Sequence, residues 1–267
     1  MLTNSLNRRW FLASSLATSI ASAHAAQTGA GGKSREYYEL RRYHVRRGPQ
    51  RKLADDYFAQ ALIPALNRLG ISPVGVFDVD IGGESPSLYA LLPAPSVETL
   101  VTAEFRLDQD AEYLKAGAAF LNAPAAEPAY ARRESSLMLA FEGMPRLTVP
   151  TATAEHQSRV FELRTYESPS DQDHKRKVEM FNSGEFDVFE KAGFWQVFYG
   201  DTVIGPRMPN LTYMIGFPDL AERARLWKAF GAAPGWKKLS SSPRYAFEEI
   251  VSNITNVILR PAEYSQI

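Results

Sequence analysis

Two rows of Glu, Arg and Tyr side chains recur in this chain and carry the groups best suited to chemistry. The first lies in Tyr-Glu-Leu-Arg-Arg-Tyr at residues 38–43, and the second in Phe-Glu-Leu-Arg-Thr-Tyr at residues 161–166. The copies are 123 residues apart, as Glu39 and Glu162 show. A guanidinium offers a rigid fork of donors that matches a carboxylate, and tyrosine adds a donor and a stacking surface. Each row could therefore bind a small anionic molecule.

Strand periodicity separates these residues by face. Successive side chains of a β-strand point to opposite sides, so Leu40 and Leu163 lie on the faces opposite the polar rows. We expect the apolar faces to lie under helices and the polar rows to point into the space between two sheets. The candidate ligand-binding residues of the two rows are Glu39, Arg41, Tyr43, Glu162, Arg164 and Tyr166. Alternatively, each glutamate neutralises its own arginine and fixes the register of the sheets.

The repeat extends into the elements around the rows. Gly70 and Gly193 keep the same spacing, and each follows an expected helix. In the first half we expect strands at 36–46, 74–81, 88–92 and 134–141 and helices at 50–69 and 96–120, with Pro64 kinking or splitting the first helix. In the second half we expect strands at 159–166, 194–199, 211–217 and 244–259 and helices at 172–192 and 220–230.

Each half is thus predicted to be a βαββαβ unit, which is the ferredoxin-like arrangement. Such a unit covers one sheet face with helices and leaves the other face in need of a partner. The second copy can supply that partner. We therefore predict an α+β fold in which two ferredoxin-like repeats, residues 36–143 and 158–262, form a dimeric α/β barrel within one chain, with a linker at 144–157.

The N-terminus indicates export. Arg8-Arg9 precede a short apolar run at 11–20, and small residues at 21–25 fit a signal-peptidase site. This pattern resembles the twin-arginine signal of bacteria, although an ordinary secretory signal fits as well. The apolar run is too short to span a bilayer. We expect residues 1–26 to be removed, residues 27–35 to form a flexible connector, and the mature protein to be periplasmic or secreted without an integral membrane span.

Composition narrows the function classes. The formal net charge is zero, which argues against nucleic-acid binding through a basic surface. The chain has no cysteine, so disulfides, thiol nucleophiles and thiolate metal sites are excluded. His156 and His174 do not form a metal-ligand spacing. No nucleophile triad or phosphate-binding loop stands out, so the sequence identifies no catalytic residue and no metal site.

A segment of the second half carries a family resemblance. The strand at 161–166 is followed by Phe-Pro-Asp-Leu-Ala-Glu-Arg at 217–223 and by Pro-Gly-Trp at 234–236. Together they resemble the NIPSNAP domain, clearly over 159–260 and more weakly over 36–142, where the second helix lacks the arginine pair and the Trp turn. The resemblance adds three candidate ligand-binding residues, Arg225, Trp227 and Trp236. The two tryptophans are also consistent with ordinary core packing.

The resemblance implies the dimeric α/β-barrel superfamily but no particular activity. Three functions stay open. The first is the binding of a small, partly apolar or anionic molecule between the sheets. The second is a haem- or quinol-type monooxygenase, as in some relatives within that superfamily, although no cofactor is evident and no haem-ligand motif is present. The third is a structural or interaction domain without a ligand. A homo-oligomer is open as well.

Overall fold

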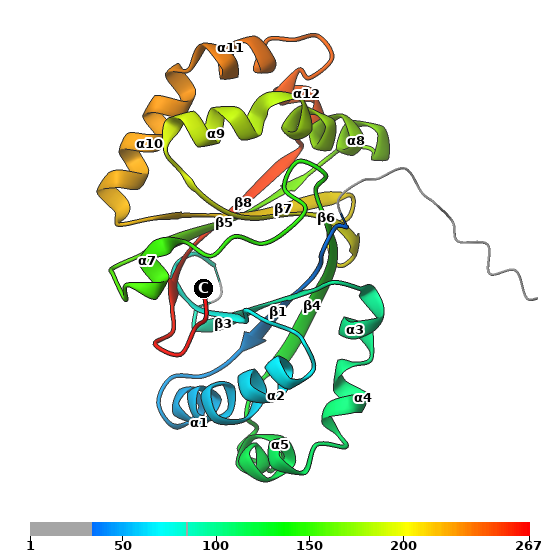
Figure 1. The fold of residues 1–267 in the computed structure, drawn as a ribbon, viewed down its shortest axis with the longest axis vertical. Coiled ribbons are helices and arrows are strands. Elements are labelled where there is room, and N and C mark those ends of the chain that lie inside the picture. Colours follow the sequence, from blue (N-terminus) through cyan, green and yellow to red (C-terminus); the bar gives the residue numbers. More distant parts are fainter. Residues whose placement is uncertain (1–33, 84) are drawn as a thin grey trace, which may run out of the picture. The chain divides into compact units, whose positions relative to one another are not determined.

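Eight strands close into one antiparallel barrel in the part of the chain that the structure describes (Figure 1). The computed structural model describes residues 34–83 and 85–267, so the expected signal peptide lies outside it. The strands are β1 (Tyr37–His44), β2 (Gly75–Ile81), β3 (Ser87–Ala94), β4 (Arg132–Ala140), β5 (Val160–Glu167), β6 (Trp195–Ile204), β7 (Asn210–Phe217) and β8 (Asn253–Pro261). Their order around the barrel is β1-β3-β2-β8-β5-β7-β6-β4.

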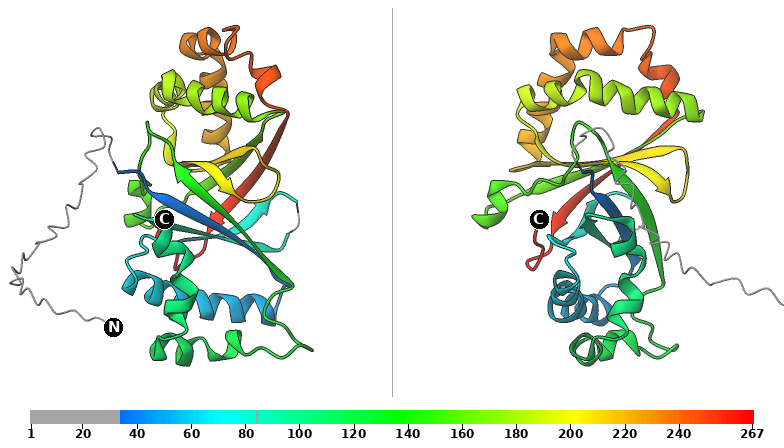
Figure 2. Two further views of the ribbon diagram at one scale, coloured as in Figure 1. Left: turned by 90° about the vertical axis from the view of Figure 1, so that its right-hand side faces the viewer. Right: turned by 45° about the vertical axis from the view of Figure 1, so that its right-hand side comes forward.

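Each half of the barrel is a four-stranded sheet. The first half has the order β4-β1-β3-β2, the second has β6-β7-β5-β8, and the pairs β2–β8 and β4–β6 join them. Helices cover the outside of both sheets (Figure 2). The predicted fold class is therefore confirmed: a mixed α/β barrel made of two repeats.

The two halves keep one residue offset over most of their length. Strand β1 begins at 37 and β5 at 160, while β3 begins at 87 and β7 at 210, so both offsets are 123. A π-helical turn is repeated with the same offset, as η1 (Phe58–Leu62) and η2 (Phe181–Glu185). Each residue of one half can therefore be compared with its counterpart 123 positions away.

The helices of the second half cover the outer face of β5 and β7. They are α8 (Asp171–Met180), η2, α9 (Phe186–Ala192), α10 (Leu220–Ala232), α11 (Pro234–Ser240) and α12 (Phe247–Ile250). The sequence predicted a strand throughout 244–259, but α12 occupies part of that range and β8 starts only at Asn253. A short α7 (Thr151–Ala154) lies in the expected linker.

The helices of the first half are more broken. They are α1 (Pro49–Tyr57), η1, α2 (Ile63–Arg68), α3 (Val97–Val101), α4 (Ala103–Leu107), α5 (Ala111–Ala116) and α6 (Ala118–Leu121). The single helix predicted at 96–120 is thus four short ones. Pro64 lies in the first turn of α2, directly after η1, and the helical run continues through it. None of the helices in the described ranges is long and apolar enough to cross a membrane.

Apolar side chains fill three layers. The barrel interior holds one cluster, which includes Tyr38, Leu91, Phe161, Leu163 and Met214. Two large clusters lie between each sheet and its helices, and a small one is formed by Met180, Tyr245 and Ile250. Because both faces of each sheet are buried, neither face has to be polar.

Candidate functional site

The Glu-Arg-Tyr rows lie under the helices and not between the sheets, so the predicted assignment of faces is wrong. Leu163 belongs to the apolar cluster of the barrel interior, and Leu40 packs against it. Tyr43 and Tyr166 belong to the clusters beneath the helices instead. The physical reason is that the helices supply partners for the charges, Arg223 for Glu162 and Glu104 for Arg41, whereas the barrel interior around Leu163 is apolar.

Glu162 is the centre of the second row. Its carboxylate has no exposed surface. It accepts two hydrogen bonds from Arg223 of α10, from Nε and Nη2, each 2.7 Å long. It also accepts 2.7 Å and 2.8 Å bonds from Arg164 Nη1 and Trp227 Nε1. Burial would raise the pKa of Glu162, but Arg223, Arg164 and Trp227 outweigh it and hold the pKa below its ordinary value.

Arg164 connects this carboxylate to a buried pair of phenols. Its Nε and Nη2 donate to the Tyr166 hydroxyl at 3.2 Å and 3.1 Å, and its guanidinium lies 4.7 Å from the Trp227 ring centroid. The Tyr166 hydroxyl lies 2.9 Å from that of Tyr213. Burial raises the pKa of both phenols, so both stay protonated at neutral pH.

A buried ion pair lies next to this network. Lys177 Nζ of α8 is 2.5 Å from Glu185 Oε2 of η2, and the two side chains are 0% and 2% exposed. The ammonium lies 4.3 Å from the Phe181 ring centroid and 4.9 Å from that of Phe247. Trp236 is 5.9 Å away. Burial lowers the pKa of Lys177 and raises that of Glu185, because desolvation disfavours both charged forms.

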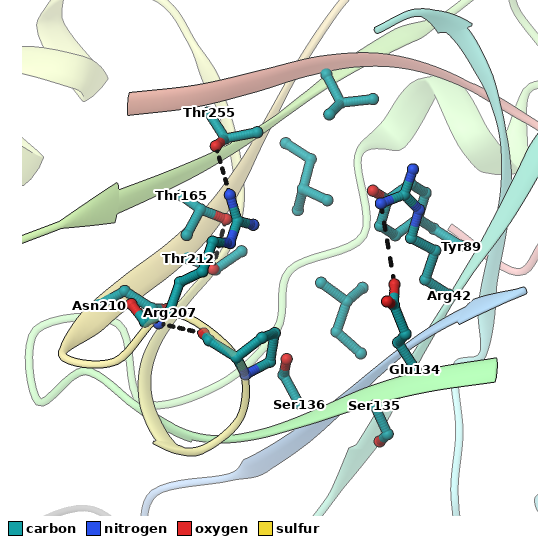
Figure 3. A pocket seen from close by; sticks show the side chains of 14 residues that line it. Arg42, Tyr89, Glu134, Ser135, Ser136, Thr165, Arg207, Asn210, Thr212 and Thr255 are labelled. Atoms are coloured by element: carbon teal, nitrogen blue, oxygen red, sulfur yellow. Dashed lines mark hydrogen bonds and ion pairs between the residues drawn. The ribbon is translucent and has the colours of Figure 1, made fainter. Parts of the chain in front are cut away.

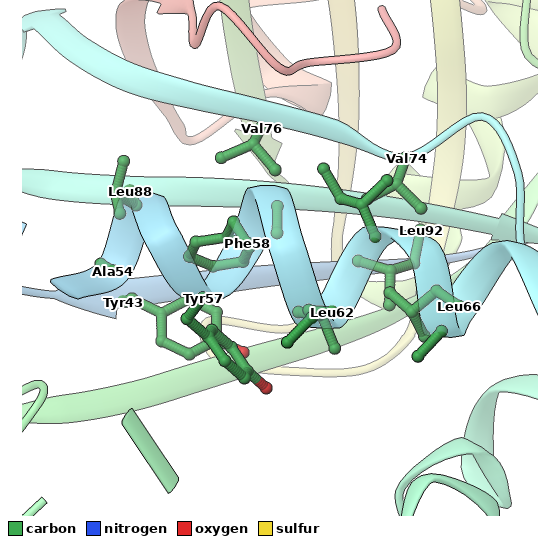
Figure 4. Packing of buried hydrophobic residues seen from close by; sticks show 14 of the residues in the cluster. Tyr43, Ala54, Tyr57, Phe58, Leu62, Leu66, Val74, Val76, Leu88 and Leu92 are labelled. Atoms are coloured by element: carbon green, nitrogen blue, oxygen red, sulfur yellow. The ribbon is translucent and has the colours of Figure 1, made fainter. Parts of the chain in front are cut away.

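The first half shows that the fold does not need this polar network. The positions 123 residues before Lys177, Glu185, Tyr199 and Tyr213 hold Ala54, Leu62, Val76 and Ala90. All four are buried in an apolar cluster, part of which is drawn in Figure 4. The same backbone plan is therefore stable with an apolar core, and the charges of the second half need another explanation.

The first row forms a smaller network whose central residue is an arginine instead of a glutamate. Arg41 is 1% exposed and lies between two carboxylates. Its Nη2 donates to Glu39 at 2.8 Å, and its Nη1 lies 2.7 Å from Glu104 of α4. Glu104 is the counterpart of Trp227. A central arginine between two acids thus replaces a central acid between two arginines.

The structure brings together most of the predicted residues of the second half. Glu162, Arg164, Tyr166 and Trp227 are in direct contact, and Trp236 lies at the edge of the same cluster. Arg225 is elsewhere: it is exposed and pairs with Glu222 at 2.6 Å. Helical spacing could have shown this, because Arg223 and not Arg225 lies four residues before Trp227. No strand or helix pattern pointed to Lys177 and Glu185.

A pocket does open between the two sheets, at one mouth of the barrel (Figure 3). It has an inner part of about 80 Å³ and an adjoining outer part of about 470 Å³. Arg42 and Thr165, the variable residues of the two Glu-Leu-Arg-x-Tyr motifs, line it. The remaining polar lining includes Tyr89, Glu134, Ser136, Arg207, Thr212 and Thr255. The space between the sheets thus has a polar mouth above an apolar interior, and none of the predicted ligand-binding residues lines that mouth.

Arg207 lies at the rim of this mouth in an uncommon conformation. Its φ is 59°, in the left-handed region that disfavours non-glycine residues. Its Nη1 donates to Thr255 Oγ1 at 2.8 Å and lies 3.3 Å from Glu167. Within the described ranges, the structure shows no partner for Nε and Nη2 of Arg207.

Glu134 faces Arg207 across the mouth and is bound by His44 at 3.0 Å and by Arg42 at 3.9 Å. The hydrogen bond with His44 and the nearby positive charges lower the pKa of Glu134. The mouth thus has Arg207 on one side and the carboxylate of Glu134 with Arg42 beside it on the other. His174, the other buried imidazole of the described residues, is held by Asp201 at 2.7 Å, and no cluster of metal-ligating side chains occurs there. Each of these two imidazoles thus has a carboxylate partner.

Residues 38–141 and 161–266 each match the NIPSNAP domain. The chain belongs to the NIPSNAP family. Among solved structures, this NIPSNAP protein is similar to a proposed monooxygenase from Lactobacillus acidophilus, with 7% identity, 85% of this chain and 94% of that chain covered, and a TM-score of 0.56. A proposed monooxygenase from Fusobacterium nucleatum has 8% identity, coverage of 85% and 93%, and a TM-score of 0.55.

A NIPSNAP-like domain protein from Burkholderia xenovorans is 21% identical over 42% of this chain and 92% of that one, with a TM-score of 0.38. No curated protein matches the sequence. The likenesses to the two proposed monooxygenases, with TM-scores of 0.56 and 0.55, show that the two NIPSNAP domains together adopt the same fold as those proteins. At identities of 7% and 8%, a shared fold does not show a shared activity.

Proposed function

We propose that this NIPSNAP protein binds a small carboxylate at the barrel mouth between the sheets. The observation that carries the proposal is Arg207, whose Nε and Nη2 are directed to no described protein group although the residue is held in a strained conformation. Strain of this kind persists only where the surroundings enforce it, and it is concentrated at functional sites. A guanidinium with two unused donors on one edge matches a carboxylate.

The rest of the mouth defines the other end of the ligand. The carboxylate of Glu134 disfavours a second negative charge on the ligand and accepts hydrogen bonds from a hydroxyl or an amine. Leu40, Leu163 and Val257 form the apolar floor. We therefore infer a compact hydroxy- or amino-carboxylate, small enough for an inner pocket of about 80 Å³.

Thermal unfolding in the presence of glycolate, lactate, glycine or succinate tests this function. A ligand that binds only the folded chain raises the melting temperature. We expect a shift with the first three compounds, a smaller one with the dicarboxylate succinate, and loss of the shift in Arg207→Ala. Arg225→Ala is the matched control, because Arg225 is an exposed arginine paired only with Glu222 in the described structure. The proposal fails if no compound shifts the wild type, or if Arg207→Ala responds unchanged.

A monooxygenase-like activity is the second candidate, and the buried cluster of the second half favours it. Titratable groups with shifted pKa values are frequent at active sites, and Tyr166, Lys177 and Glu185 are all of this kind. The fold likeness to two proposed monooxygenases is consistent with it. Oxygen consumption with added quinols, compared between wild type and Tyr166→Phe, tests it. Equal rates with and without the protein would remove this candidate.

We also propose that the twin-arginine pattern directs the chain to the periplasm. Fractionation of cells that express Arg8→Lys with Arg9→Lys is the test, and Arg35→Lys is the control beyond the signal. Retention of the double variant in the cytoplasm supports the twin-arginine route. Normal export of that variant would favour an ordinary secretory signal, and cytoplasmic wild type would contradict export altogether.

Self-association is proposed through α3 and α4 of the first half. Val97, Val101 and Phe105 recur every four residues and are 38%, 57% and 74% exposed. Light scattering of wild type and Phe105→Ser tests the interface, with Ile204→Ser as a control at another exposed apolar residue. A monomeric wild type would contradict it.

A further inference from the structure

A second cavity lies outside the barrel, between α9 and α11 of the second half. In Figure 1, α11 lies above α9 on the helical side of that half. The cavity has a volume of about 700 Å³, which is within the usual range for small-molecule sites. Its apolar wall is formed by Val188, Leu239, Ala233 and Pro234. It is independent of the barrel mouth and shares no residue with it.

Two glycines line this cavity at points where side chains of the neighbouring helix come close to the backbone. Gly184 has a φ of 149°, and a Cβ at this position would lie 3.6 Å from the Leu239 side chain. A Cβ at Gly235 would lie 3.1 Å from the Val188 side chain, which is closer than ordinary contact. The counterparts of Gly184 and Gly235 in the first half are Ala61 and Glu112. The first half therefore has larger residues at both of these positions.

The charges along the cavity are unbalanced. Lys191 and Lys238 line it, and neither forms an ion pair with a residue in the described part of the chain. Asp187 is the one acidic residue among the lining residues. An apolar wall with an excess of one positive charge matches a molecule with an apolar chain and a single anionic head.

We propose that the cavity between α9 and α11 binds a medium-chain carboxylate. Its alkyl chain lies along Val188 and Leu239, and its head group is held by Lys191 and Lys238. Each buried methylene strengthens binding about fourfold, so chain length should control affinity. The small polar ligand proposed for the barrel mouth has no alkyl chain to pack against this apolar wall. Binding at the two sites can therefore be tested separately.

Calorimetric titration of the mature full-length chain with sodium decanoate tests the site. We expect saturable binding with one molecule per chain, about sixteenfold weaker binding of octanoate, which has two methylenes fewer, and weaker binding of 1-decanol. Lys191→Glu with Lys238→Glu should weaken decanoate at least tenfold and leave 1-decanol unchanged. Lys237→Glu is the matched control, because Lys237 is an exposed neighbour that does not line the cavity.

Gly235→Ala provides a second, steric test, with Gly231→Ala as its control because a Cβ there meets no atom within 4 Å. We expect Gly235→Ala to weaken both decanoate and 1-decanol, and Gly231→Ala and Arg207→Ala to change neither. Absence of saturable decanoate binding overturns the proposal. Equal losses in Lys237→Glu and in the double lysine variant would do so as well, since binding would then follow surface charge alone. The lysine variants decide the matter even if Gly235→Ala folds poorly.

Discussion

Lys177 and Ala54 occupy equivalent positions of the two halves, and both side chains are completely buried. One is a cation paired with Glu185, and the other is a methyl group in the same apolar cluster as Leu62. Burying the lysine costs desolvation free energy. The first half packs with alanine at the equivalent position, so packing alone does not require this cost. This pair of residues leads directly to the first prediction.

Lys177→Ala should destabilise the chain by about 3–5 kcal/mol, because it leaves the Glu185 carboxylate buried without its partner. Lys177→Ala combined with Glu185→Leu copies the first half and should recover most of that loss. Urea denaturation of wild type, both single variants and the double variant measures the coupling. Equal losses in the single and double variants would show that the pair is not coupled.

Arg223 and Arg225 form a matched pair on one helix. Arg223→Ala should cost about 2 kcal/mol, because it removes two hydrogen bonds from the buried carboxylate of Glu162. Arg225→Ala removes an exposed pair and should change the free energy of unfolding by less than about 0.5 kcal/mol. Chemical denaturation checks both. Similar values for the two variants would contradict the network described around Glu162.

The stability of the chain should depend on pH through Glu162. Its pKa in the folded chain lies below its ordinary value of 4.5, so the unfolded chain takes up a proton first as the pH falls. The stabilisation by the carboxylate is therefore complete above pH 4.5 and is lost as the pH falls towards the lowered pKa. The difference in unfolding free energy between wild type and Glu162→Gln should shrink across this window. A difference in unfolding free energy that does not change with pH would contradict a lowered pKa of Glu162.

Gly184 should resist substitution for a backbone reason. At a φ of 149°, an alanine is strained, and we expect Gly184→Ala to lose about 1–3 kcal/mol. Gly231→Ala, inside α10 and with open space around its Cα, should be neutral or stabilising by up to about 1 kcal/mol. The melting temperatures of the two variants are compared. An equal loss of stability in Gly231→Ala would contradict the backbone explanation for Gly184.

The strand pattern predicted the barrel but could not orient its faces. Alternation places Leu163 opposite Glu162 and Arg164, and this was right. In a barrel covered by helices, however, both sides of each strand are buried, so hydrophobicity alone does not tell the inside from the outside. The deciding contact, from Arg223 to Glu162, joins residues 61 positions apart.

The candidate sites were predictable to different degrees. Glu162, Arg164 and Tyr166 stood out because the motif is repeated, and Trp227 and Trp236 through the family resemblance. Lys177 and Glu185 looked like ordinary surface residues of a charged helix, because their burial depends on how α11 and α12 cover α8 and η2. Arg207 lies in the loop between β6 and β7, and hydrophobic periodicity predicts neither the conformation of such a loop nor the positive φ of this residue.

The pairing of β2 with β8 and of β4 with β6 has a consequence for how this protein can change. Two identical chains that closed the same barrel would receive every substitution twice, once in each copy. Here, a substitution alters one side alone, and each half always meets the same partner. The fusion therefore allows the two copies to diverge, so that the first keeps Ala54 and Leu62 at the positions where the second has the buried pair Lys177 and Glu185.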